Sequence, residues 1–197
     1  MKEKIHILML EDDPLDAELN REQILLLEDY ECTVDLIHDR ERYIKSLETE
    51  PLPDLILCDY NLPQYTGVEA LKELNSRDIL VPFIFVTGAM PEEVAADAIK
   101  AGAWDYVVKD RLFRLPLAIR GAMQLKKEKE SAREAELLNE RLLNAIEETQ
   151  AQIILMDIDG RIEYANKNYL SYIGMSKEDI YGRKLMELYE ERGRIAD

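Results

Sequence analysis

The chain has 197 residues and carries 41 acidic against 25 basic side chains, which gives a formal net charge of −16 and a pI near 4.6. This acid excess argues against a protein that binds nucleic acid or an anionic membrane through its overall charge. The apolar content of 47% excludes a wholly disordered chain, two cysteines are too few for a disulfide framework, and no apolar stretch reaches the roughly 18 residues of a membrane span.

Residues 1–113 alternate short apolar runs with helical patterns and hold a net charge of −14. The runs at residues 5–10, 32–37, 55–59, 81–87 and 104–109 are predicted to be strands, and several are apolar almost throughout, as in strands covered on both faces. Apolar residues at helical spacing lie between them, for example Leu15, Leu19 and Leu26. This alternation predicts a doubly wound α/β fold with a five-stranded parallel sheet.

Local signals mark where two of the helices begin. Asp13 is placed to cap a helix that has Pro14 at its first position and Asp16 at its third. Thr66 and Glu69 have the spacing of a capping box. We therefore expect helices to start at residues 14 and 67.

Residues 114–150 have a net charge of zero, are dense in Glu, Lys, Arg, Leu and Ala, and contain no Gly or Pro after Gly121, which is typical of a long helix. Seam positions 115, 118, 122 and 125, and then 138, 142, 145 and 149, follow three-four spacing, but Lys129 and Glu136 interrupt them. We interpret the segment as a signalling linker, and a solvated spacer and a dimer contact remain as two alternatives.

Residues 151–197 begin with a predicted β-hairpin over 152–157 and 161–165 that turns at Asp159-Gly160. A short helix follows, with a capping box that starts at Ser176. The segment is too short to close a sheet around a core of its own, so we expect it to be the first part of a domain.

In open parallel α/β sheets, ligands bind at the carboxyl ends of the strands. The side chains expected there are Glu11, Asp12, Asp59, Thr87 and Lys109. Three crowded carboxylates repel one another unless a cation lies among them, and a hard divalent ion such as Mg²⁺ suits oxygen ligands. Because Lys109 and Thr87 can contact phosphate oxygens, Asp59 is a candidate nucleophile for forming an aspartyl phosphate.

The motifs ILMLEDDP, LILCDYNLPQYTG, FIFVTGA and WDYVVKD contain these residues, and with them residues 1 to about 125 resemble a response-regulator receiver domain of two-component signalling. The resemblance implies a flavodoxin-like strand order, 2-1-3-4-5. It implies that Asp59 is the phosphoacceptor and also touches the metal. Glu11 and Asp12 would form the acidic pair of the metal site, with Asp12 the direct Mg²⁺ ligand.

Further roles follow from the same resemblance. Asn61 would offer its backbone carbonyl to the metal, while Thr87 and Lys109 would contact the phosphoryl group. Tyr106 occupies the place of an aromatic switch that turns inward as Thr87 moves toward the phosphate, and the family reads this change on the face of the fourth helix, fifth strand and fifth helix. Asp110 stands where many receivers have a cis proline; a non-proline cis bond costs about 3 kcal/mol, so the loop either keeps that strain or takes a trans path.

The motifs IILMDIDGRIEYANKNYLSYIG and SKEDIYGRKLMELY are similar to the beginning of a PAS sensor domain, with Asn166, Gly174 and Gly182 in the family's places. We therefore expect a receiver domain over residues 1–125, a helix over 114–150 that continues from its last helix, and the N-terminal part of a PAS domain, an incomplete α+β segment, over 151–197. Because receivers joined to PAS occur in longer sensory proteins, we expect the chain to be truncated.

Together the resemblances imply a cytoplasmic protein of phosphorylation-dependent signal transduction, using Mg²⁺, rather than an enzyme in the turnover sense. Phosphate would come from a partner histidine kinase or phosphotransfer protein, because the helix at residues 114–150 contains no His. A homodimer through that helix is one of the two alternatives given above for it, and we expect no nucleic-acid or membrane partner. The alternative is a receiver-like scaffold that dimerises through the same helix and is never phosphorylated.

Overall fold

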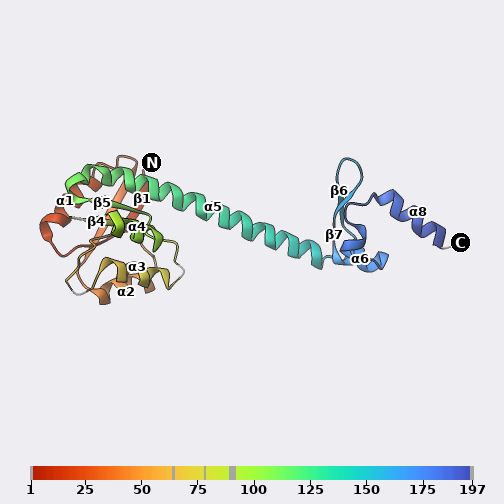
Figure 1. Cartoon of the computed structure of the whole chain (residues 1–197), viewed down its shortest axis with the longest axis horizontal. Coiled ribbons are helices and arrows are strands. Elements are labelled where there is room, and N and C mark those ends of the chain that lie inside the picture. The colour runs from red at the N-terminus through yellow and green to blue at the C-terminus, as the bar shows by residue number, and fades with distance from the viewer. Residues whose placement is uncertain (1, 64, 78, 89–91, 196–197) are drawn as a thin grey trace. The chain divides into compact units, whose positions relative to one another are not determined.

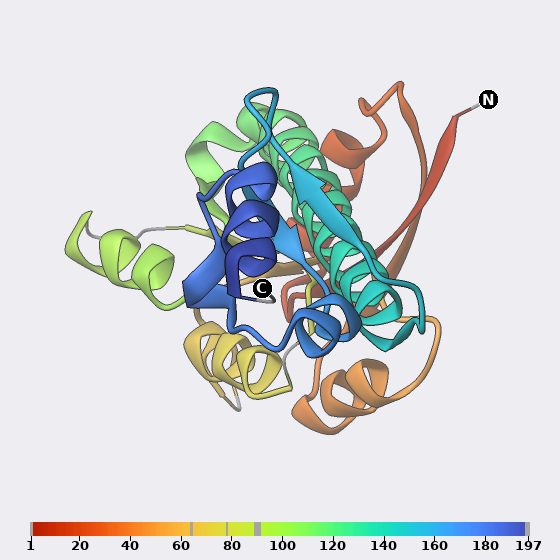
Figure 2. The same cartoon turned by 90° about the vertical axis from the view of Figure 1, so that its right-hand side faces the viewer.

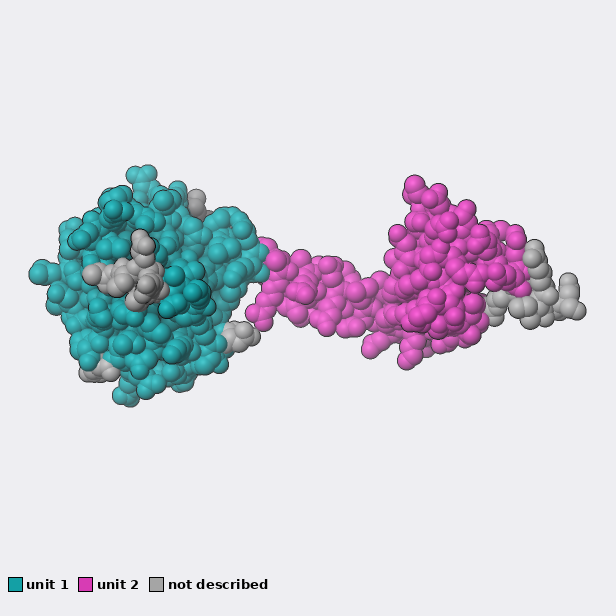
Figure 3. All heavy atoms as spheres, viewed as in Figure 1, with its two compact units in different colours: residues 1–130 teal, residues 131–197 magenta. Residues whose placement is uncertain are grey.

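The computed structural model describes residues 2–63, 65–77, 79–88 and 92–195, and the chain divides into two compact units, residues 1–130 and 131–197 (Figure 1, Figure 3). The motif residues Gln64 and Ala89 fall outside the described ranges. Unit 1 contains β1 (Glu3–Leu10), α1 (Pro14–Ile24), β2 (Tyr30–Ile37), α2 (Arg40–Glu48), β3 (Leu55–Cys58), α3 (Gly67–Asn75), β4 (Phe83–Thr87), α4 (Glu92–Lys100), β5 (Asp105–Val108), the 3₁₀ helix η1 (Lys109–Arg114) and the first part of α5 (Leu115–Glu148). Unit 2 contains the rest of α5, β6 (Ile154–Met156), β7 (Ile162–Ala165), α6 (Lys167–Ile173), α7 (Lys177–Ile180) and α8 (Leu185–Ile195).

The strands of unit 1 form one parallel sheet in the order β2-β1-β3-β4-β5, which confirms the predicted topology. Leu10 at the end of β1 pairs with Ile37 at the end of β2 and with Cys58 at the end of β3. The carboxyl ends of these three strands are therefore level, and the residues that follow them meet at one edge of the sheet.

Helices cover both faces of this sheet. The buried cluster on one face joins Ile7 and Met9 of β1 to α1 and α5, and the cluster on the other face joins Leu8 and Phe83 to α2, α3 and α4. Figures 1 and 2 show α2 and α3 together on one side of the sheet. The central strands are buried on both faces, which explains why their sequences are apolar runs without alternation.

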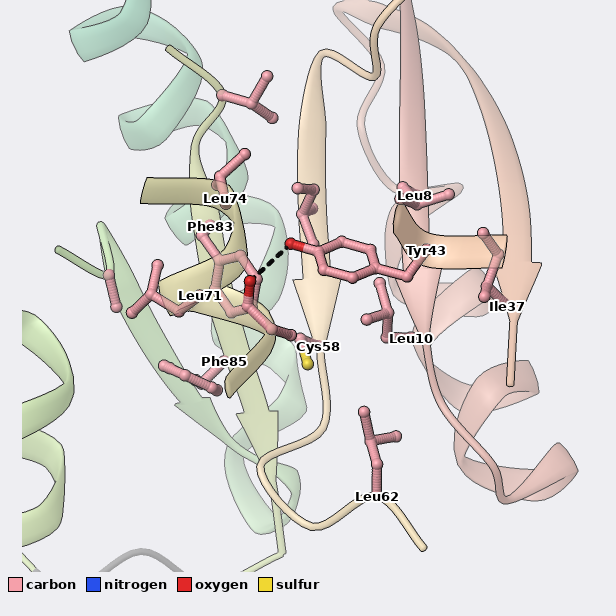
Figure 4. Packing of buried hydrophobic residues seen from close by; sticks show 14 of the residues in the cluster. Leu8, Leu10, Ile37, Tyr43, Cys58, Leu62, Leu71, Leu74, Phe83 and Phe85 are labelled. Carbon is pink, nitrogen blue, oxygen red and sulfur yellow. Dashed lines mark hydrogen bonds between the residues drawn. The ribbon is translucent and has the colours of Figure 1, made fainter. Parts of the chain in front are cut away.

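Tyr43 of α2 is fully buried in the cluster that contains Leu8, Leu10 and Phe83 (Figure 4). Its Oη donates a hydrogen bond of 2.8 Å to the backbone oxygen of Ala70 in α3. Burial raises the pKa of the Tyr43 hydroxyl, which therefore stays protonated as a donor. This bond joins α2 to α3 across the core.

The strand boundaries differ from the predicted ones by one or two residues at several ends. The fourth strand begins at Phe83 rather than at residue 81, although the backbone oxygen of Pro82 still accepts a hydrogen bond of 2.8 Å from Ile56 N. The helix α2 was not predicted, although Tyr43 and Leu47 stand four residues apart and are both buried.

The apolar spacing in α1 did not identify the buried face of this helix. Leu15 and Leu19 are exposed, as is Leu26 beyond the end of α1, whereas Ala17 and Ile24 face the sheet. A helix with apolar residues on several faces gives no clear stripe, so the spacing alone did not show which face is buried. The predicted helix starts are confirmed, since both the cap at residue 13 and the capping box at residues 66 and 69 are formed.

Four basic side chains of α5 bind the opposite edge of the sheet, where the strands begin. The pairs are Arg120 with Asp29 (3.1 Å), Lys126 with Asp54 (3.2 Å), Lys127 with Glu3 (2.5 Å) and Lys129 with the ring of Trp104 (4.7 Å to its centroid). Glu3 opens β1, and the other three partners directly precede β2, β3 and β5. We refer to these four basic residues as the basic collar.

Unit 2 is built on the antiparallel hairpin β6–β7, as predicted, with Gly160 at a φ of 74° in its turn. Its small core gathers side chains from β7 and the three short helices: Ile162, Ala165, Tyr169, Ile173, Ile180 and Leu188. The capping box predicted at Ser176 is formed with Asp179. None of the described helices is both long and apolar enough to cross a membrane.

Candidate functional site

Buried polar side chains gather where the strands of unit 1 end. Glu11 follows β1, Asp59 follows β3, Thr87 closes β4 and Lys109 follows β5. Glu11 is 1% exposed, Asp59 8% and Thr87 0%. Burial of such groups costs free energy unless each is hydrogen-bonded or paired, so this edge must supply partners.

The backbone fixes Asp59 beside the end of β1. Its N–H donates to Leu10 O at 2.9 Å, which extends the ladder between β1 and β3 by one residue. Gly67, the first residue of α3, packs so closely that a Cβ there would lie 2.6 Å from Asp59 O and 2.7 Å from the ring of Phe85. Glycine at this position therefore allows α3 to approach the loop that presents Asp59.

Lys109 lies at the centre of three carboxylates. Its Nζ is 2.6 Å from Asp59 Oδ2, 2.9 Å from Glu11 Oε2 and 2.5 Å from Asp16 Oδ2. One oxygen from each of these three carboxylates lies within 4.8 Å of the others. The first, third and fifth strands and the first helix thus each contribute one charged group to a single cluster.

The electrostatics of the cluster follow from burial and mutual contact. Burial raises the pKa of Glu11 above its ordinary value, although the hydrogen bond from Lys109 opposes that rise. For Lys109, burial works to lower the pKa, but hydrogen bonds to Asp16, Asp59 and Glu11 outweigh it and raise the pKa. Lys109 is therefore a permanent ammonium ion at neutral pH.

The structure brings Glu11, Asp59 and Lys109 together at the strand ends, and the role of Asp12 as a metal ligand remains a prediction. Asp12 is exposed and does not belong to the cluster of three carboxylates. Asp16 does belong to it, and sequence reasoning treated Asp16 only as an acid in the first turn of a helix. Asp16 can take part because α1 begins early: Pro14, its first residue, comes only four positions after Leu10, the last residue of β1.

The other predicted site residues lie around the same edge. The backbone N–H of Asn61 donates to Asp59 Oδ1 at 3.1 Å, and the role of the Asn61 carbonyl remains a prediction. Thr87 is fully buried at the end of β4. Tyr106 in β5 is half-buried against the core cluster on the α2–α4 side. The Lys109–Asp110 peptide is trans, so the chain takes the trans path where many receivers have a cis proline.

The donor set of this cluster suits a hard divalent cation. All three side chains offer carboxylate oxygens, which Mg²⁺ prefers, and they lie close enough to share one ion. Within the described part of the chain, this is the one group of three or more potential metal ligands. Lys109 is the cation that these three carboxylates share in the structure.

In unit 2 the polar contacts are structural rather than a cluster of this kind. Asn166 is fully buried, and its Nδ2 donates to the backbone oxygens of Ile146 (3.0 Å) and Ala151 (2.8 Å). Its Oδ1 accepts from Ile153 N (2.9 Å) and Tyr169 N (3.0 Å). One side chain thus ties the end of α5 to the hairpin and to α6.

Comparison with known proteins identifies the same two families that the sequence motifs resemble. The response regulator receiver domain family matches residues 7–120, and the PAS fold family matches residues 146–196. The chain is 30% identical over 155 residues to the probable C4-dicarboxylate response regulator DctR of Halalkalibacterium halodurans. The matched region covers 78% of this chain and 66% of that protein. The chain thus spans just under two thirds of this relative's length.

Solved structures show the same fold. The signal receiver domain of a putative LuxO repressor protein from Vibrio parahaemolyticus aligns with a TM-score of 0.59 at 24% identity, over 66% of this chain and 97% of that one. The Mn²⁺-bound form of the response regulator Rcp1 aligns with a TM-score of 0.51 at 25% identity, over 58% of this chain and 91% of that one. The chain belongs to the response regulator receiver domain family of two-component signalling, and a PAS-fold segment follows its long helix.

Proposed function

We propose that residues 1–125 act as a phosphorylation-controlled switch in which Asp59 accepts a phosphoryl group from a partner histidine kinase or phosphotransfer protein. The observation that carries this proposal is the placement of Lys109 Nζ 2.6 Å from Asp59 Oδ2 within a cluster of three carboxylates. An isolated acid at a strand end has no need for such a setting, because capping or solvation would satisfy it.

Each residue has a separate task in the transfer. An Asp59 carboxylate oxygen attacks phosphorus, the bond from phosphorus to the donor's leaving atom breaks, and the donor leaves with that electron pair. Lys109 and Thr87 contact the oxygens of the transferred group, and Asn61 N–H orients the carboxylate through its bond to Oδ1. We assign Mg²⁺ to a site formed by Glu11, Asp12, Asp59 and the Asn61 carbonyl, where it would neutralise phosphoryl oxygens. Rcp1, which shares the fold, is described with Mn²⁺ bound.

The partner that supplies phosphate needs a surface beside this cluster. Leu15 on α1 is 76% exposed and Phe113 on η1 is 72% exposed, and α1 and η1 are in contact. Exposed apolar groups of this size favour a protein interface. We propose this surface as the docking place of the kinase, because Leu15 adjoins Asp16 of the cluster and Phe113 follows Lys109 by four residues.

The output of the switch runs through the face formed by α4, β5 and α5 and along α5. Tyr106 in β5 is the proposed aromatic switch that follows Thr87. Leu138 and Leu142 of α5 are exposed, which supports a homodimer through this helix. We propose a cytoplasmic location and no nucleic-acid contact for this chain, and we keep residues 1–125, 114–150 and 151–197 as the proposed domain limits.

Incubation with acetyl phosphate and Mg²⁺, followed by intact-protein mass spectrometry, tests the proposal. We expect one added phosphoryl group on the wild type and none on Asp59→Ala or Asp59→Asn. If the wild type gains no mass, the chain is instead a receiver-like scaffold. If Asp59→Ala gains as much as the wild type, the phosphoryl group goes to another residue and the assignment to Asp59 is wrong. Sedimentation of residues 1–125 against the full chain tests the dimer, and a monomer in both cases would rule it out.

A further inference from the structure

Asp16 is a third carboxylate in the cluster that the proposed phosphoryl transfer does not require. It stands at the third position of α1, and its Oδ2 is 2.5 Å from Lys109 Nζ, as close as the Asp59 contact of 2.6 Å. Its side chain is 32% exposed, whereas that of Glu11 is 1% exposed. Asp16 therefore approaches the cluster from its solvent side and shares the one ammonium group with the phosphoacceptor.

The charge of Asp16 has two opposite effects on the site. An additional carboxylate near the other two strengthens the attraction for a divalent cation, because ligand charge adds to affinity. The same carboxylate repels a phosphoryl group, which brings about two negative charges at neutral pH. It also accepts a hydrogen bond from Lys109, and a phosphoryl group on Asp59 has to compete for that ammonium.

We propose that Asp16 is a positioning residue that sets the lifetime of the phosphorylated state: it tightens divalent-cation binding and, by holding Lys109, shortens the life of the aspartyl phosphate. This inference rests on the proposed phosphorylation of Asp59. The step concerned is hydrolysis, in which a water oxygen bonds to phosphorus, the bond from phosphorus to the Asp59 oxygen breaks, the carboxylate re-forms and inorganic phosphate leaves with the water's protons.

The substitution Asp16→Asn tests this role without removing the cap of α1. The start of α1 does not depend on the Asp16 carboxylate, because Asp13 Oδ1 caps the helix by accepting from Leu15 N (2.8 Å) and Asp16 N (3.4 Å). Asparagine keeps the shape of the side chain, removes its charge and replaces one carboxylate oxygen by an NH₂ group. Glu22→Gln is the matched control, since Glu22 is an exposed acid on the same helix and its replacement changes the net charge equally.

The experiment uses the full chain as wild type, Asp16→Asn and Glu22→Gln. Calorimetric titration with Mg²⁺ measures cation affinity. Phosphorylation with acetyl phosphate, removal of the donor and timed mass spectrometry measure the half-life of the phosphoryl group. For Asp16→Asn we expect cation binding about tenfold weaker and a phosphoryl half-life longer by about threefold or more, while Glu22→Gln matches the wild type in both.

The two measurements moving in opposite directions support the inference. Loss in both would mean that Asp16 only maintains the site, and no change in either, or equal changes in Glu22→Gln, would mean that it has no specific role; each of these results overturns the proposal. If the wild type gains no phosphoryl group at all, the proposed function itself fails and the lifetime role fails with it, an outcome distinct from the other three.

Discussion

Glu147, near the end of α5, and Tyr164, in β7, are joined by a hydrogen bond in which Tyr164 Oη donates to Glu147 Oε1 at 2.8 Å. The second carboxylate oxygen of Glu147 accepts from Lys167 N, also at 2.8 Å, and Lys177 Nζ lies 3.6 Å from the first. The last turn of α5 is therefore bonded to the hairpin and to the start of α6.

Replacing Tyr164 by Phe should raise the pKa of Glu147. The hydrogen bond from Tyr164 is the main cause that lowers this pKa, so its removal brings the carboxyl back toward its ordinary value. Carboxyl NMR titration of wild type and Tyr164→Phe measures the change, and Tyr172→Phe, at an exposed position, is the control. An unchanged Glu147 pKa in Tyr164→Phe would show that the bond does not persist in solution.

The same pair predicts how unit 2 responds to alkaline pH. Burial and the bond to Glu147 raise the pKa of Tyr164 to about 12. The unfolded chain releases this proton near the ordinary tyrosine value of about 10, so unit 2 should lose stability as pH rises from there toward 12. Thermal unfolding across this range should show a smaller loss in Tyr164→Phe than in the wild type.

Asn166→Ala should destabilise unit 2 by about 2–4 kcal/mol, because it leaves buried backbone groups without partners. The amides of Ile153 and Tyr169 lose their acceptor, and the oxygen of Ile146 loses its donor. Hydrogen exchange should therefore accelerate in unit 2, including at these two amides. Asn144→Ala, at an exposed position of α5, should leave their exchange unchanged.

Two glycine substitutions should change the stability of unit 1 in opposite directions. Gly67→Ala places a Cβ 2.6 Å from Asp59 O, so α3 or the Asp59 loop must shift, at a cost of about 2–3 kcal/mol. Gly121→Ala meets no atom within 4 Å and should stabilise α5 by up to about 1 kcal/mol. Urea unfolding measures both, and equal effects would contradict the close packing at Gly67.

Lys109→Met should destabilise unit 1 by about 2–3 kcal/mol at pH 7 in buffer containing EDTA, because three carboxylates then lose their cation. Burial already raises the pKa of Glu11, and removing Lys109 removes an effect that opposes the rise. A carboxyl with a raised pKa binds its proton more tightly in the folded state, so the variant should recover stability as pH falls from 7 toward 5. Lys100→Met, on the exposed surface, should show neither effect, and an equal loss at pH 5 and 7 would contradict this account.

The sequence predicts the topology of unit 1 well. Strands buried on both faces appear as continuous apolar runs, and their alternation with helices along the chain is compatible with few folds. It identifies Glu11, Asp59 and Lys109 through their positions at strand ends. The sequence is a poorer guide to which face of a helix is buried. Leu15 and Leu19 have the right spacing for a buried stripe but are exposed, because α1 packs against the sheet through Ala17, Asn20 and Ile24 instead.

The involvement of Asp16 could not be read from strand ends, because Asp16 lies on a helix. Its carboxylate reaches Lys109 only because α1 begins at Pro14 and turns its third residue back over the end of β1. Asp12, next to Glu11 in sequence, is exposed instead, since consecutive residues leaving a strand point in different directions. Its role as a metal ligand remains a prediction.

The basic collar has a mechanical consequence for α5. This helix follows η1, which begins at Lys109 of the carboxylate cluster, and the collar fastens it to residues at the far edge of the same sheet. A shift of its first turn along the helix axis must therefore either break ion pairs at the collar or carry the starts of β1, β2 and β3 with it. The helix is thus held at both edges of the sheet, by the basic collar at one edge and through η1 by the Lys109 cluster at the other. High salt weakens exposed ion pairs, so it should loosen the contacts of the collar and leave the Lys109 cluster in place.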